Sequence, residues 1–244
     1  MKMGGNNYFY TRSIQKTIPV MKNSLNPLLA VMFLLVSCSG GETDLARSGL
    51  KGKVSSITER QFKAVHKDGN WVAGNPVYLG YQVRNYNREG FYLESIAVAG
   101  SGDTLGFTRC RRENGEMVEE SFHSVVEKRS TRTLFERVSG EQVNFEVWEG
   151  EQLLYEGASY NDSKGRIVRQ VGVVNDLEVV NYSVYEKNLL VELYQEDLAG
   201  NRTMTQHYEY TAFDDQGNWT SRLVYVGEEK ITPEVVATRE YTYY

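Results

Sequence analysis

The chain has 244 residues, with 27 basic and 32 acidic side chains and a formal net charge of −5. Residues 1–37 contain four basic and no acidic residues, so the remainder carries 23 basic and 32 acidic residues, a net charge of −9. Such an acidic chain lacks the basic face that nucleic-acid binding requires. The two cysteines, Cys38 and Cys110, are too few for a disulfide framework.

The first elements in the chain are predicted to be a targeting segment. Residues 28–36 form the apolar run LLAVMFLLV behind Lys22 and a second methionine, Met21. This run is too short to span a bilayer as a helix, which takes about 20 residues. A basic start before a short apolar core is typical of a secretory signal peptide. We therefore predict a signal peptide over residues 1–37, with Met21 as the true start.

The apolar run ends in Leu35-Val36-Ser37-Cys38, which resembles the lipobox of bacterial lipoproteins. The resemblance implies cleavage before Cys38, acylation of its thiol and a lipid anchor in the bacterial cell envelope, at the outer membrane, facing the periplasm or the surface. The small, polar residues 38–50 predict a flexible tether. Cys110 has no histidine nearby in the sequence, and we interpret it as an inert, buried thiol.

A repeat of about 25 residues begins after the tether. Its marker is a glycine or asparagine whose third following residue is aliphatic in six of seven cases. The marker positions are Gly69, Gly90, Gly115, Gly140, Gly165, Asn188 and Gly217. A second turn signal lies about ten residues after each marker, so every unit is expected to contain two strands and two turns.

The segment SYNDSKGRIVRQV, residues 159–171, shows what the marker glycine does. Asp162 stands three residues before Gly165, an arrangement that is typical of a type I turn with positive φ at the glycine. Between such turns, residues 142–147 alternate polar and apolar side chains, which indicates a strand. Asp162 is therefore interpreted as a turn residue and not as a cation ligand.

These observations predict an all-β fold over residues 51–244, an antiparallel β-meander of 12 to 14 strands in tandem hairpin repeats. The sheet is expected to curl or fold over itself, and the sequence leaves open whether it closes. Two segments, around 118–129 and 189–194, also fit a helical stripe, but the repeat register favours strands. An outer-membrane barrel is disfavoured because Thr238, Glu240 and Thr242 would share a face with Tyr244, whereas such barrels need an apolar lipid face.

The segments Tyr160–Ile167 and Phe213–Trp219 resemble YD (Rhs-type) repeats, in which a tyrosine and an aspartate precede a glycine, a polar residue and an aliphatic residue. The C-terminal run from Tyr208 is similar to the ends of Bacteroidota lipoproteins built from degenerate units of this kind. The resemblance implies a fold of tandem β-hairpins, but not the toxin-encapsulating shell of that family, which needs many more repeats. The period here is longer than in standard YD repeats, and the aspartate is often missing.

The sequence shows no catalytic or metal-binding constellation. The three histidines, His66, His123 and His207, have no metal-ligand spacing. Each turn offers one or two acidic oxygen donors, fewer than a calcium loop supplies. We therefore predict no metal, no cofactor and no catalytic residue.

Two functional hypotheses remain. In the first, the protein is a membrane-anchored, non-catalytic β-repeat scaffold that binds an envelope protein or glycan, with Trp71, Trp148 and Trp219 as candidate stacking residues. In the second, it is an envelope enzyme acting on polysaccharide, whose residues meet only in three dimensions. A pocket with paired acids of perturbed pKa would favour the enzyme.

Overall fold

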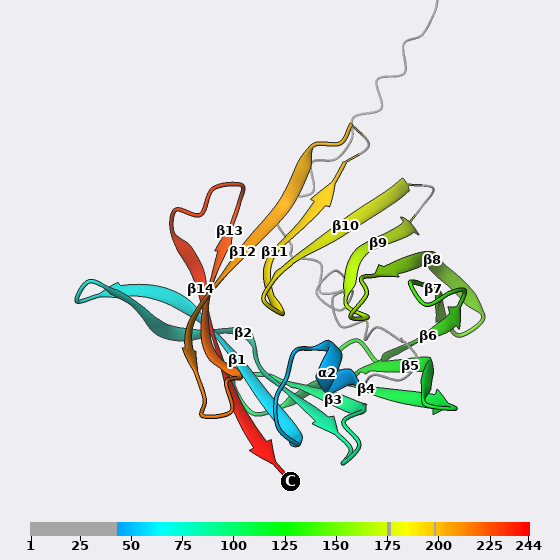
Figure 1. Ribbon diagram of the computed structural model, residues 1–244, viewed down its shortest axis with the longest axis horizontal. Coiled ribbons are helices and arrows are strands. Elements are labelled where there is room, and N and C mark those ends of the chain that lie inside the picture. The colour runs from blue at the N-terminus through cyan, green and yellow to red at the C-terminus, as the bar shows by residue number, and fades with distance from the viewer. Residues whose placement is uncertain (1–42, 175–176, 198) are drawn as a thin grey trace, which may run out of the picture. The chain divides into compact units, whose positions relative to one another are not determined.

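The computed structural model describes residues 43–174, 177–197 and 199–244. In these ranges the chain forms a short helix, α2 (Asp44–Arg47), and fourteen strands (Figure 1). No helix of the described ranges is long and apolar enough to cross a membrane. The strands are β1 (Val54–Lys67), β2 (Asn70–Tyr86), β3 (Tyr92–Val98), β4 (Thr104–Glu113), β5 (Glu116–Ser124), β6 (Arg129–Arg137), β7 (Gln142–Glu149), β8 (Gln152–Asn161), β9 (Ile167–Val174), β10 (Leu177–Glu186), β11 (Leu189–Glu196), β12 (Arg202–Phe213), β13 (Trp219–Val226) and β14 (Pro233–Tyr243).

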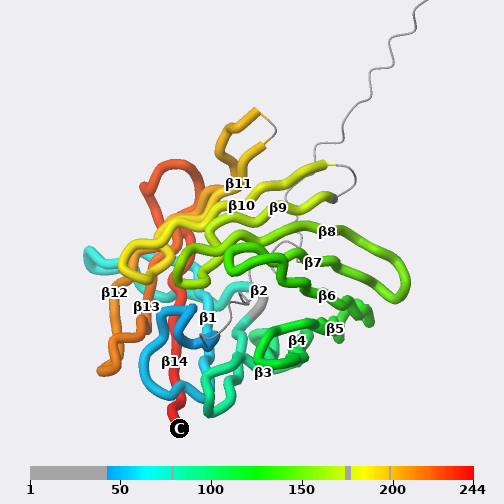
Figure 2. Tube along the Cα trace, turned by 45° about the vertical axis from the view of Figure 1, so that its right-hand side comes forward, coloured from blue at the N-terminus to red at the C-terminus, as the bar shows by residue number. Residues whose placement is uncertain are grey.

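The sheet is a closed antiparallel barrel. Each strand pairs with the next one in the sequence, as the colour order in Figure 2 shows, and β1 also pairs with β14. In this last pair Ile57 lies opposite Tyr241, and Glu59 lies opposite Arg239. The predicted meander of tandem hairpin repeats, curled or folded over itself, is therefore wrong, although the all-β class holds. Closure leaves no strand edge unpaired, and it depends on strands at the two ends of the described chain, which no local pattern connects.

The repeat register determines where the turns lie. Both ambiguous segments contain strands, β5 and β11. From Gly90 onward each unit holds two strands, so its marker turn returns to the same end of the barrel. This end, which we call the turn end, carries the turns around Gly90, Gly115, Gly140, Gly165, Asn188 and Gly217, together with the start of β1 and the end of β14.

Two marker glycines differ from the set. Gly69 lies in the turn between β1 and β2, at the opposite end, which we call the far end. Gly140 does not have positive φ, unlike Gly165 with φ 71°. In its turn the Ser139 hydroxyl instead accepts hydrogen bonds from the backbone N–H groups of Glu141 and Gln142. A glycine spacing alone thus does not define the turn type.

One face of the sheet is the lumen. Directly paired residues on neighbouring strands point to the same side. From β4 to β7, such pairs connect Cys110, Glu120, Thr133 and Val147, and the last three are buried. Near the turn end, the same face holds a core that includes Ile57, Tyr86, Tyr92, Met117 and Val143.

The opposite face is the outer wall, and it is polar. Its paired row from β3 to β7 reads Glu94, Arg109, Ser121, Arg132 and Trp148. A membrane-spanning barrel presents an apolar band about 25 Å tall to lipid. Three of the five residues in this row are charged, which breaks such a band, so this part of the wall is suited to face water.

Residues 43–50, which the sequence assigns to the flexible tether 38–50, pack against the barrel. Asp44, Leu45 and Arg47 of α2 are buried. Leu45 packs into the core at the turn end, and its backbone N–H donates to the Gly90 carbonyl at 3.1 Å. The tether prediction is therefore wrong for residues 43–50. The polar composition of this segment gives no sign of the ion pair with Arg112 on β4, which offsets part of the cost of burying Asp44; burial still raises the pKa of this carboxyl.

Candidate ligand-binding groove

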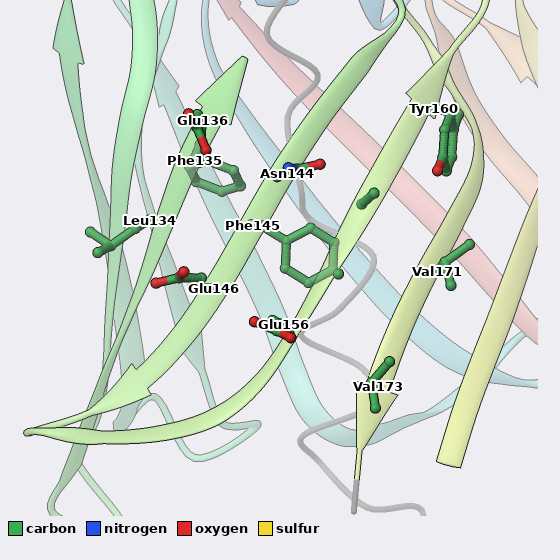
Figure 3. A pocket seen from close by; sticks show the side chains of 12 residues that line it. Leu134, Phe135, Glu136, Asn144, Phe145, Glu146, Glu156, Tyr160, Val171 and Val173 are labelled. Carbon is green, nitrogen blue, oxygen red and sulfur yellow. The ribbon is translucent and has the colours of Figure 1, made fainter. Parts of the chain in front are cut away.

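A groove of about 560 Å³ lies on the outer wall over β6, β7, β8 and β9. Its side chains come mainly from alternate positions that point away from the lumen, and Figure 3 shows them from close by. The lining consists of Leu134, Phe135, Glu136, Asn144, Phe145, Glu146, Glu156, Gly157, Ala158, Tyr160, Val171 and Val173. The groove therefore combines an apolar floor with several hydrogen-bond acceptors.

Three glutamates dominate the chemistry of the groove. Glu146 on β7 lies opposite Glu156 on β8, and Glu136 on β6 lies opposite Asn144 on β7. All three carboxylates are exposed, and in the described part of the chain no basic side chain forms an ion pair with them. The Trp148 indole N–H donates to Glu146 Oε2 at 2.9 Å. The groove thus offers carboxylate oxygens that remain available to a ligand.

An aromatic and cationic stripe continues from the groove along the outer wall. It begins at Tyr160, whose ring lies 5.0 Å from the Arg169 guanidinium. The next members are Tyr182 and Tyr194, stacked with ring centroids 4.9 Å apart. Arg202 lies 4.0 Å from the Tyr194 ring. Strands β8 to β12 thus present a row of ring faces and planar cations beside the groove.

Only one of the three predicted stacking tryptophans lies near the groove. Trp148 flanks it through the bond to Glu146. Trp219 is 6% exposed and lies against Arg222 and Arg239 in the lumen. Trp71 packs against the outer-wall cluster that includes Tyr225. Packing explains Trp71 and Trp219, so we keep Trp148 alone as a candidate.

The remaining predicted residues are placed as follows. Cys38 and residues 1–37 lie outside the described residues. Cys110 is half-buried and donates to Glu120 Oε2 at 3.9 Å.

The histidines lie apart, and the described ranges contain no group of three His, Cys, Asp or Glu side chains that could hold a metal ion. His123 Nδ1 is 2.8 Å from the Ser130 hydroxyl, and His207 Nε2 is 3.1 Å from the Glu228 carbonyl.

Asp162 is the first residue of a turn, as its sequence context indicates. The Gly165 N–H donates to the Asp162 carbonyl at 2.9 Å. The Asp162 carboxylate accepts from the backbone N–H groups of Lys164 and Arg166 at 2.9 and 3.0 Å. It also accepts from Arg166 Nε at 2.8 Å. Burial opposes ionisation, but these bonds outweigh it and lower the pKa of Asp162. The carboxylate is therefore satisfied by the protein itself.

A buried charge cluster lies in the lumen at the barrel seam. Glu59 on β1 bonds Arg239 Nε at 2.8 Å, and Arg222 and Arg84 approach it at 3.4 and 4.0 Å. Burial opposes ionisation of Glu59, but the guanidinium groups of Arg239, Arg222 and Arg84 together hold its pKa well below the usual range. This cluster joins β1, β2, β13 and β14, and its single carboxylate offsets one of the three guanidinium charges.

Glu120 is the opposite case. Its carboxyl is 5% exposed in the lumen, and burial raises its pKa to about 7, with the Cys110 thiol as a weak opposing donor. This carboxyl is on the lumen face of β5, whereas the groove is on the outer wall. The perturbed acid and the groove are thus separate.

The groove could not be recognised from sequence motifs, because its residues follow none. One signal was present: residues equidistant from a hairpin turn face each other. Glu146 and Glu156 flank the turn at Gly150, and Glu136 and Asn144 flank the turn at Gly140. The positions of the turns therefore indicate which of these residues face each other, although they do not indicate that the residues line a groove.

Comparison with known proteins yields only distant likenesses of fold, all to solved structures. No family model and no curated protein matches the chain. A solved structure of a porin-like protein from Bacteroides uniformis is similar, with 12% sequence identity and a TM-score of 0.44. The match covers 79% of this chain and 98% of that chain. A likeness at this level carries no argument about function.

Proposed function

We propose that this protein is a lipid-anchored protein of the bacterial envelope that binds a carbohydrate on the outer wall of its barrel without turning it over. The observation that carries the proposal is the groove over β6 to β9. Its exposed carboxylates and Asn144 accept hydrogen bonds, which suits the vicinal hydroxyl groups of a sugar. Its apolar floor and Tyr160 suit the C–H faces of a sugar ring.

The stripe from Tyr160 to Arg202 supports a polymeric ligand. A groove of about 560 Å³ accommodates a few sugar units. Stacked rings next to it extend the contact surface along the wall. The polar outer wall supports a barrel in an aqueous compartment, held at the membrane by the acyl group that the lipobox at Cys38 implies.

Binding is tested on a soluble form that starts after Cys38, first on a glycan array and then by calorimetry with the best ligand. We expect the double variant Glu146→Gln and Glu156→Gln to lose most of the affinity. Glu240→Gln is the matched control, because Glu240 is an exposed glutamate on the wall of β14. Equal affinities in the double variant and the wild type would rule out the groove. Hydrolysis of the glycan by the wild type would contradict non-catalytic binding and support the enzyme hypothesis.

A second candidate ligand is a basic segment of an envelope protein. The observation in its favour is that no basic side chain of the described residues pairs with the three groove carboxylates. Ionic strength separates the two ligands. Binding of a cationic peptide weakens steeply with salt, whereas binding of a neutral sugar does not.

Anchoring is tested independently of binding. We expect the wild-type protein to fractionate with membranes and to incorporate labelled palmitate, and the Cys38→Ser variant to do neither. Membrane fractionation and palmitate labelling of the variant would contradict the lipid anchor and leave the groove proposal standing.

A further inference from the structure

Residues 43–53 fasten the beginning of the barrel domain across the turn end. At one side, the Tyr92 N–H donates to Asp44 Oδ2 at 2.7 Å, and Arg112 forms an ion pair with the same oxygen. At the other side, the Lys51 N–H donates to Asn218 Oδ1 at 2.8 Å, and Asn218 Nδ2 donates back to the Lys51 carbonyl at 2.9 Å. The segment is therefore held by the turns that contain Gly90 and Gly217.

Asp44 is the central contact of this segment. Its side chain is 1% exposed, and Arg47 of the same helix approaches Oδ1 at 3.3 Å. A buried carboxylate with two guanidinium partners and a backbone donor is strongly position-specific, because these partners together offset part of the cost of its burial. α2 is thus fixed to the barrel and does not extend the tether.

The fixed segment leaves a short connection to the lipid. Thr43, the N-cap of α2, is five residues after Cys38. Five residues span at most about 18 Å even when fully extended. If residues 43–53 were released, the connection would run to Val54, sixteen residues from Cys38, and could reach about 58 Å.

We propose that α2 is an orienting latch that holds the turn end of the barrel against the membrane surface and turns the far end away from it. The proposal rests on the lipid anchor at Cys38, which is part of the proposed function. It does not depend on the ligand of the groove. The membrane surface is the partner of the turn end because the lipid-bearing residue cannot lie farther than the short connection allows.

The charges at the turn end indicate that the tether and not electrostatic attraction sets this orientation. Its exposed basic residues include Lys51, Arg88 and Lys187, but Glu89 and Asp215 are exposed beside them. A mixed surface of this kind gains little from anionic lipid, in contrast to a polybasic patch. The orientation is therefore expected in neutral membranes as well.

The orientation can be measured by energy transfer in full-length, lipidated protein added to preformed phosphatidylcholine vesicles that carry a headgroup-labelled acceptor lipid. Donor dyes are placed at Lys187→Cys, at the turn end, or at Glu228→Cys, at the far end, in a Cys110→Ser background. Both positions are exposed. We expect transfer from position 187 to be about twice that from position 228, because strands rising about 3.3 Å per residue separate the two ends.

Two changes test the latch. Asp44→Asn removes the charge that holds α2, and an insertion of about 15 Gly and Ser residues between Gly40 and Gly41 lengthens the tether without touching the barrel. Each is expected to abolish the difference in transfer, while the control Asp215→Asn keeps it. The insertion variant remains informative if Asp44→Asn fails to fold.

Three outcomes would overturn the proposal. Equal transfer from both positions in the wild-type background would show that the barrel has no preferred orientation. A difference that persists in the insertion variant, or that needs anionic lipid, would assign the orientation to the barrel surface instead of the latch. Failure of the wild type to bind vesicles would overturn the latch and the anchor together, but not glycan binding by the soluble form.

Discussion

Glu59 on β1 and Arg239 on β14 face each other across the strand pair that closes the barrel, with their side chains joined in the lumen at 2.7 to 2.8 Å. These residues are 180 positions apart in the chain. A buried carboxylate shared with Arg222 on β13 and Arg84 on β2 makes the seam specific, because a shift in register would separate Glu59 from the guanidinium groups that compensate its burial.

We predict that Glu59→Gln destabilises the barrel by about 3 kcal/mol, because it leaves three arginines without their buried counter-charge. Urea denaturation of the soluble form measures the loss. Glu240→Gln on the same pair of strands is the control, since Glu240 is 74% exposed and lies 4.0 Å from Arg60. A Glu59 variant as stable as this control would show that the seam does not depend on the cluster.

The same cluster predicts a loss of stability in acid. The folded-state pKa of Glu59 is lowered, so its contribution is present above the unfolded value near 4.5 and is lost as the pH falls below it. We expect the wild type to lose stability between pH 4.5 and pH 2 more steeply than Glu59→Gln. Parallel curves for the two proteins in that range would contradict this assignment.

Glu120 is expected to change the pH dependence of stability in the opposite direction to Glu59. Its pKa rises from 4.5 to about 7 on folding, so the folded protein keeps a proton that the unfolded chain releases between these values. Stability from this group is therefore full below pH 4.5 and falls as the pH rises to about 7. We predict that Glu120→Gln stabilises the protein at pH 8 by an amount on the order of 3 kcal/mol and has little effect at pH 4. Denaturation at both pH values tests the sign.

How much of this fold can be predicted from the sequence depends on how far apart the interacting residues are in the chain. Turns such as Asp162–Gly165 are local, and the sequence identifies the turn because two residues and their spacing decide it. Strand order follows from the repeat, since short turns force neighbours to pair. Closure was not readable, because the contact between Glu59 and Arg239 joins strands that share no local signal.

The groove shows the same limit. Its carboxylates are ordinary surface glutamates in the sequence, and only the pairing of Glu146 with Glu156 brings them together. Residues 43–50 were assigned to a flexible tether for a related reason. The sequence does not indicate that Asp44 pairs with Arg112, which follows it by 68 positions. Composition describes a segment by itself, whereas burial depends on its partner.

The close approach at Gly157 gives a test of lumen packing. A Cβ at this position would lie 2.0 Å from the Val171 carbonyl oxygen and 2.6 Å from Phe145 Cζ. We predict that Gly157→Ala costs about 1–3 kcal/mol, because a backbone atom must shift to admit the methyl group. Gly100→Ala is the control, since no atom lies within 4 Å of its added Cβ. Thermal melting compares the two, and equal melting points would contradict the packing argument.

The last prediction concerns the turn at Asp162 and Gly165. Gly165→Val should cost about 1–3 kcal/mol, because Gly165 has φ 71° and a β-branched residue resists positive φ. Asp162→Ala should cost on the order of 2 kcal/mol, since it removes the acceptor of two backbone N–H groups and the partner of Arg166. Asp162→Asn keeps the backbone acceptor and loses the charge, so it should fall between the wild type and Asp162→Ala.

Melting experiments with calcium test whether this turn also binds a cation. Because the protein already satisfies the Asp162 carboxylate, the melting temperatures of wild type and all three variants should be the same with calcium and with chelator. A wild-type melting temperature that rises by several degrees with calcium, and a rise that Asp162→Ala abolishes, would make the turn a cation site. The lower stability of the Asp162 variants would then be explained by lost calcium binding, because a ligand that binds only the folded state stabilises it.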